Sequence, residues 1–154
     1  MRDRAEFEAL YRRHFPTVWN VCISLLHDPA VTEDMVHDTF LRLLESDRRF
    51  ESAEHEKAWL IVTARNVCRN ELKRSRRRDA PQTERADPTP LLDETLLAVR
   101  RLPEKYRLPL YLYYYEGYAT AEIAQMLRRA DSSVRSDLRR GRLLLKQELG
   151  GAEV

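Results

Sequence analysis

The apolar positions of this chain recur with the spacing of α-helices, and no segment alternates apolar and polar residues as a strand does. In the first half the pattern predicts three long helices, over residues 6–27, 33–46 and from about 53 to 72. Thr32 is the residue expected to cap the second helix, because two acidic residues follow it and favour the positive end of the helix dipole. Three helices of this length can close one small core together, although none would be stable alone.

A proline-containing stretch separates this half from a second helical region. Residues 79–90 read DAPQTERADPTP, with three prolines and no large aliphatic side chain. Such a segment cannot bury enough apolar surface to offset its ordering entropy, whereas helical periodicity returns directly after it. The sequence therefore predicts an all-α fold of two small helical domains, residues 1–78 and 92–154, joined by a flexible linker over residues 79–91.

The most informative segment lies between residues 119 and 147 and has the spacing of a helix-turn-helix. A short helix is expected over residues 120–127, a break over 128–130 and a longer helix after it, with caps from Thr120 and from one of residues 131–133. With the apolar side chains turned inward, the longer helix directs polar side chains outward, where helix-turn-helix docking places them against the major groove and its phosphates. These outward residues are Ser132, Ser133, Arg135, Ser136, Arg139 and Arg140. An ordinary pair of amphipathic helices with a solvated basic face is the alternative.

Charge is distributed unevenly, although the net charge of the 154 residues is only +2. Residues 65–78 hold seven Arg or Lys against one acidic residue, and residues 128–146 hold seven against two. Two separated basic surfaces are typical of a protein that binds nucleic acid. On the third predicted helix, cations that suit phosphate alternate with amides that can pair with base edges, and Trp59 nearby is interpreted as a core residue rather than a stacking platform. The residues of this face are Arg65, Asn66, Arg69, Asn70 and Lys73.

The second predicted helix carries the opposite charge. Glu33, Asp34 and Asp38 stand beside Phe40 and Leu41. Apolar residues framed by charge are typical of a surface that docks on a protein, and like charge would repel DNA phosphate. A solvated face beside the core is the alternative.

The remaining features indicate a protein without a metal or a membrane anchor. Cys22 and Cys68 fall on apolar helix faces without metal-ligand spacing, which predicts buried thiols in a reducing compartment. No signal peptide opens the chain and the apolar runs are shorter than the ~18 residues of a membrane span, so we expect a cytoplasmic protein with no membrane insertion and no cofactor. The His-Asp pairs at 27–28 and 37–38 could suggest a metal-dependent phosphohydrolase, but further ligands do not converge on them.

Three stretches resemble the sigma-70 family of bacterial transcription initiation factors, of the small extracytoplasmic-function (ECF) type. Residues 33–44 read EDMVHDTFLRLL, which is similar to a signature of the family's region 2. Residues 58–74 contain AWL, ARN and LKR at the spacing of the following helix, and residues 102–142 resemble region 4 through LP, EG, EIA and VRS. The three stretches occur in the family's order and cover nearly the whole chain.

The resemblance implies a factor that docks on core RNA polymerase and directs it to promoter DNA, without catalysis of its own. The first domain would bind the clamp helices of the largest subunit and the −10 element, and the second would bind the flap of the other large subunit and the −35 element. An anti-sigma factor is an expected further partner, and a stand-alone helix-turn-helix regulator that needs no polymerase is the alternative. The implied polymerase contacts are Asp34, His37, Asp38, Phe40, Leu41 and Leu44. The implied −10 contacts are Arg65, Asn66, Arg69, Asn70, Lys73 and Arg74, and the implied −35 contacts are the six outward residues of the helix-turn-helix.

Several positions depart from the family pattern. His37 stands where glutamine is usual and Leu44 where tryptophan is usual, which would alter the polymerase contact. The pair at 128–129 is Arg-Arg in place of a common Gly-hydrophobic turn, so the easily left-handed residue is lost. Asp137 replaces a frequent arginine, and it would weaken phosphate binding unless it pairs with an arginine such as Arg140.

Overall fold

The protein is all-helical in the two ranges that the computed structural model describes, residues 3–75 and 94–150. The chain separates into two units, with the division between residues 89 and 90. This confirms the all-α prediction with two helical modules. The linker predicted over residues 79–91 lies outside the described residues.

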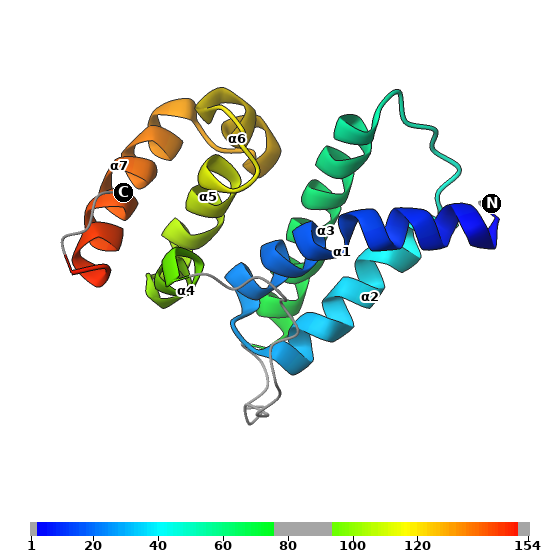
Figure 1. The fold of residues 1–154 in the computed structure, drawn as a ribbon, viewed down its shortest axis with the longest axis horizontal. Coiled ribbons are helices and arrows are strands. Elements are labelled where there is room, and N and C mark those ends of the chain that lie inside the picture. The colour runs from blue at the N-terminus through cyan, green and yellow to red at the C-terminus, as the bar shows by residue number, and fades with distance from the viewer. Residues whose placement is uncertain (1–2, 76–93, 151–154) are drawn as a thin grey trace. The chain divides into compact units, whose positions relative to one another are not determined.

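The first unit is a bundle of three helices, α1 (Arg4–Leu26), α2 (Pro29–Glu45) and α3 (Ala53–Ser75), each of which packs against the other two (Figure 1). Their apolar stripes meet in a closed core, as the spacing predicts. The side chains at its centre, all 2% exposed or less, include Val18, Val21, Phe40, Leu43, Leu60, Ile61 and Ala64.

The start of α2 differs from the prediction. Asp28 caps this helix by accepting a hydrogen bond from the backbone N–H of Ala30 at 2.9 Å, and Pro29 occupies the first turn. Thr32 lies inside the helix, fully buried. An Asp-Pro pair is a better start than a threonine three residues later, because proline's fixed φ suits the first turn and its missing N–H costs nothing there.

Two polar contacts tie α1 to α3 at the edge of the core. The Nε2 atom of His14 lies 2.6 Å from Oε1 of Glu56, and Arg13 reaches the same oxygen at 3.2 Å. Deeper in the bundle, Cys22 and Cys68 are free thiols that are fully buried. A hydrogen bond to Cys68, together with burial, holds the pKa of the Cys22 thiol well above its usual range. The predicted burial of both thiols is confirmed.

The second unit is built around α7 (Asp131–Glu148), which packs on α4 (Glu94–Arg101), α5 (Glu104–Tyr114) and α6 (Thr120–Leu127). Gly141 permits a close approach of α7 to α5. A Cβ atom placed on it would lie 2.9 Å from Cδ1 of Leu110 and 3.3 Å from Cβ of Tyr106. A larger residue at this position would push the two helices apart.

The turn between α6 and α7 forms where it is predicted, but the helix caps differ. Arg128 ends α6 in the left-handed conformation, at φ 53° and ψ 49°. The Glu122 carboxylate accepts a hydrogen bond from the backbone N–H of Ala119 at 2.9 Å, so Thr120 is the first helical residue and not the cap. Helix α7 likewise begins at Asp131 after Ala130, with no side-chain cap. Sequence spacing placed both caps one or more residues too late.

Candidate nucleic-acid interface

The buried and exposed faces of α7 lie as the helical period predicts. Val134, Leu138 and Leu145 are 5% exposed or less and form the side that packs on the rest of the unit. Of the six predicted DNA-facing residues, Ser136 is half-buried and the others are exposed, namely Ser132, Ser133, Arg135, Arg139 and Arg140. The exposed side of α7 therefore carries three guanidinium groups, those of Arg135, Arg139 and Arg140.

One flank of this surface is a cationic cleft of about 260 Å³ between α7 and the ends of α5 and α6. Arg135 also pairs with Asp131 one turn earlier, at 3.0 Å on the helix surface. Sequence reasoning did not include Tyr113, Thr120 or Arg142 in the site, although the seven-residue spacing from Arg135 to Arg142 was a signal for the last of them. The residues that line the cleft are Tyr113, Thr120, Arg135, Leu138, Arg139 and Arg142.

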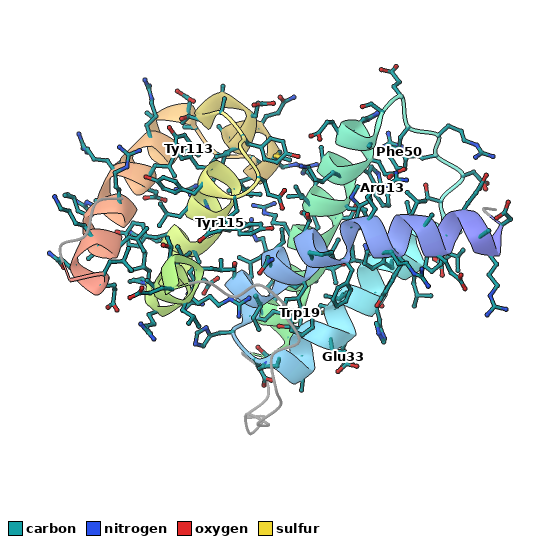
Figure 2. All side chains as sticks on the ribbon, viewed as in Figure 1. Arg13, Trp19, Glu33, Phe50, Tyr113 and Tyr115 are labelled. Atoms are coloured by element: carbon teal, nitrogen blue, oxygen red, sulfur yellow. The ribbon has the colours of Figure 1, made fainter. Side chains whose placement is uncertain are left out.

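Tyr113, which lines this cleft, is the first of three consecutive tyrosines. Tyr113, Tyr114 and Tyr115 are each between 36% and 37% exposed, and Figure 2 labels the first and last of them. The Tyr114 hydroxyl accepts a hydrogen bond from Nε of Arg142 at 2.8 Å. The arginine head is thereby held beside an aromatic ring, an arrangement that suits a phosphate or a base edge.

The other flank of α7 holds an ion pair. Asp137 is buried, and its Oδ2 lies 2.5 Å from a terminal guanidinium nitrogen of Arg129, a residue of the turn. Asp137 does pair with an arginine, but the partner is Arg129 rather than the Arg140 that helical spacing suggested. The eight-residue separation falls outside helical spacing, so only the geometry of the turn brings the two together.

In the first unit, α3 presents a basic surface on the side away from the core. Arg65 and Asn66 are half-buried and hydrogen-bonded to each other at 3.2 Å between Nη1 and Oδ1. Arg69, Asn70, Lys73 and Arg74 are exposed, and Arg74 pairs with Glu71 at 2.6 Å. All six predicted residues are thus on the accessible half of one helix.

Trp59 lies at the edge of this helix, half-buried, and contacts the loop that leads into α3. Its ring centroid is 5.7 Å from that of Phe50, which in turn meets His55 edge-on at 5.5 Å. Figure 2 labels Phe50 on that loop. Trp59 was interpreted as a core residue, but it packs at the edge of the bundle and is only half-buried.

On α2, five of the six predicted polymerase-binding residues reach the surface. Leu41 is 49% exposed, which is unusual for a large apolar side chain, and Phe40 is the exception to the set because it is only 2% exposed. Phe40 packs in the core with its ring centroid 4.6 Å from that of Tyr11, since it lies on the apolar stripe of α2. Asp34, His37 and Leu41 are exposed, and Asp38 and Leu44 are half-buried.

Within residues 3–75 and 94–150, no three His, Cys, Asp or Glu side chains come together in a way that could hold a metal ion. Among the helices of the same ranges, none combines the length and the apolar character that a membrane crossing requires.

A three-helix bundle with a basic helix, followed by a helix-turn-helix unit, defines the class of two-module helical DNA-binding proteins. Comparison with models of protein families identifies the family within this class. Residues 10–78 match the family model for sigma-70 region 2, and residues 92–145 match the one for sigma-70 region 4. The chain belongs to the sigma-70 family, as an ECF-type RNA polymerase sigma factor.

Similar proteins agree over nearly the full length. The ECF RNA polymerase sigma factor SigL of Mycobacterium tuberculosis is 31% identical, over 96% of this chain and 93% of the relative. RNA polymerase sigma factor CarQ of Myxococcus xanthus is 28% identical, over 99% and 95%. Among solved structures, the sigma factor RpoE of Bartonella quintana, in complex with the anti-sigma factor NepR, has the same fold at a TM-score of 0.73 and 23% identity, over 94% of this chain and 97% of that one. These findings favour a sigma factor over a stand-alone regulator.

Proposed function

We propose that the two units divide promoter recognition between them, and that the first unit also docks on the polymerase. In this proposal the α2 surface around Leu41 binds the clamp helices of the largest core subunit, and the basic face of α3 holds the −10 element. Helix α7 reads the −35 element in the major groove while its unit binds the flap of the other large subunit. The observation that carries the proposal is the opposite electrostatic character of α2 and α3 within one bundle.

The electrostatics of the first unit support two different partners. Helix α2, on which Leu41 is exposed, carries four acidic residues against one arginine, so a polyanion would be repelled there while an apolar, basic protein surface would be attracted. On α3, four cations and two amides occupy the accessible half of the helix. Cations suit phosphates, and amides suit the edges of unpaired bases in an opened duplex. One bundle can thereby join the polymerase to the promoter.

Further parts of the proposal concern organisation. We assign residues 1–78 to the first functional domain, 79–91 to a linker that follows the polymerase interior, and 92–154 to the second domain. The protein acts in the cytoplasm, without catalytic chemistry, cofactor or metal of its own. An anti-sigma factor is a proposed further partner, supported by the complex in which the Bartonella quintana sigma factor was solved. Repeated pull-downs from the host that return only polymerase subunits would count against that partner.

The polymerase-docking part is tested at Leu41. Because Leu41 is exposed, Leu41→Lys leaves the core intact, places a long cation in the contact and removes its apolar centre. We expect at least about fivefold weaker binding to core polymerase, the effect of losing more than about 1 kcal/mol at an interface anchor. The matched control is Leu41→Met, which keeps the volume and apolar character and binds like the wild type. Equal affinity of the Lys variant and the wild type would remove α2 from the interface.

The promoter-reading part is tested at Arg139, which is exposed in the middle of α7. An arginine that reads guanine bidentately contributes about 1–3 kcal/mol of discrimination, whereas one that grips phosphate contributes uniformly across sequences. Arg139→Ala holoenzyme is compared with the wild type on a library varied in the −35 element. Relaxed selection at one base pair assigns base reading, and a uniform loss assigns phosphate contact. An unchanged holoenzyme would show that Arg139 faces no DNA.

A further inference from the structure

The Arg129–Asp137 pair joins the helix-turn-helix turn to the DNA-facing helix. Arg129 follows the left-handed Arg128, and its backbone N–H donates to the carbonyl of Ala124 at 2.9 Å. Its side chain is 32% exposed, whereas that of Asp137 is 11% exposed. The carboxylate is therefore nearly enclosed, whereas the side chain of Arg129 is partly accessible to solvent.

Asp137 occupies a sensitive place on α7. Helical spacing puts Ser133 one turn before it and Arg140 one turn after it on the same flank, and both are exposed members of the proposed DNA surface. A bare carboxylate beside them would repel the phosphates of a bound duplex. Asp137 is also unsuited to reading cytosine, because the side chain is buried and one of its oxygens already accepts from Arg129.

The two flanks of α7 differ in charge as a result. Arg135, Arg139 and Arg142 line the cleft on the flank that faces α5 and the start of α6. On the flank that faces the turn, the charges of Arg129 and Asp137 cancel, which leaves Arg140 as the cation of α7 there. A helix lying in the major groove has one phosphate strand on each side, so the strands would meet unequal fields.

We propose that Arg129 is a positioning residue that neutralises Asp137, so that the carboxylate fastens the turn to α7 without opposing the duplex. This inference rests on the proposed role of α7 as the DNA-facing helix. In this arrangement Arg129 contributes to DNA binding only through Asp137, and it becomes dispensable once the carboxylate is gone.

The test is a double-mutant cycle in the full chain, with Arg129→Ala, Asp137→Asn and the double variant. Fluorescence anisotropy measures binding to a short mixed-sequence DNA duplex across a salt series. The affinity for DNA falls as the salt concentration rises from about 50 to 200 mM. Each additional positive charge that faces the duplex makes this fall about threefold larger. Arg129→Ala unmasks one negative charge, so its affinity is lower at low salt and falls about threefold less over this range. Asp137→Asn releases the guanidinium, so its affinity falls about threefold more.

The double variant distinguishes three possible roles of the Arg129–Asp137 pair, which are neutralisation, direct phosphate contact and a purely structural contact. Neutralisation predicts that Arg129→Ala with Asp137→Asn restores the wild-type salt dependence. If Arg129 contacts a phosphate directly, the double variant should keep the weaker salt dependence of Arg129→Ala. If the pair is purely structural, all variants should show the same salt dependence of affinity. Either result overturns the inference. If Arg129→Ala fails to fold, the comparison of wild type, Asp137→Asn and the double variant still separates the three. Absence of salt-dependent binding by the wild-type chain would instead refute the DNA-facing role of α7.

Discussion

Replacing Arg128 by glycine is expected to stabilise the second unit. Arg128 holds a left-handed backbone at the end of α6, with φ 53° and ψ 49°. An L-residue with a Cβ atom pays about 1–2 kcal/mol for this conformation, because Cβ approaches the following carbonyl oxygen. Glycine avoids that clash, and the backbone N–H that meets the carbonyls of Ala124 and Gln125 is kept.

The net gain is smaller than the strain alone. Glycine has more conformational freedom in the unfolded chain, which reduces the stability gained from the relieved strain by about 0.5–1 kcal/mol. The expected balance for Arg128→Gly is therefore about 0.5–1 kcal/mol of added stability. For a unit of this size such a change corresponds to about 2–8 °C in the midpoint of thermal unfolding.

The distribution of tryptophan allows a clean assay. Both tryptophans, Trp19 and Trp59, lie in the first unit, so their fluorescence follows that unit while far-UV circular dichroism follows both. Arg128→Gly should raise the midpoint temperature of the second unit, which is seen by dichroism alone, and should leave the fluorescence transition of the first unit unchanged. Arg128→Ala keeps the Cβ atom and should gain nothing. His27, at φ 62°, is the matched left-handed position in the first unit, and His27→Gly should move the fluorescence transition instead. An unchanged or lowered transition in Arg128→Gly would refute the strain argument.

Three further outcomes are expected. Asp28→Ala should lower the free energy of unfolding, measured in urea, by about 1 kcal/mol, because the helix cap is lost. Thr32→Val should leave it unchanged, because the Thr32 hydroxyl has no hydrogen-bond partner among the described residues. A larger loss in Thr32→Val than in Asp28→Ala would instead identify Thr32 as the cap. Gly141→Val should destabilise the second unit by about 1–3 kcal/mol through overpacking against α5, and a wild-type dichroism midpoint would show that the helices can separate without cost. The raised pKa of Cys22 means that the folded state keeps a proton that the unfolded state loses, so the contribution of Cys22 to stability should be present below the unfolded pKa of about 8.5 and decline as pH rises above it. Cys22→Ala should flatten that decline, and an equally steep decline in the variant would assign it to another group.

Helical periodicity was sufficient to predict the helices and most of their buried faces. Val134, Leu138 and Leu145 recur on one side of any helix drawn through them, so the burial of that side follows from the sequence alone. The caps were less predictable because neighbouring residues compete for them. Asp28 with Pro29 outweighs Thr32, and this choice depends on local backbone geometry that a pattern does not carry.

The residues of the candidate interface were likewise predicted only in part. Exposed residues such as Arg139 follow from the helical period, whereas Phe40 lies on both the apolar stripe and the resembling motif, and packing decided in favour of the core. The partner of Asp137 was beyond a helical pattern, because Arg129 reaches it only through the left-handed turn at Arg128. The division of promoter elements between the units depends on surfaces of other molecules, so it came from resemblance.

Transcription in vitro tests the central claim most directly, with core RNA polymerase, the purified chain and a library of genomic fragments. The account predicts that initiation requires the chain and selects fragments that share two short sequence elements, one for each unit. Substitutions on α3 should then alter selection at the downstream element, and substitutions on α7 at the upstream one. Core polymerase that initiates no differently with the chain, or selects a single element read by α7 alone, would contradict it.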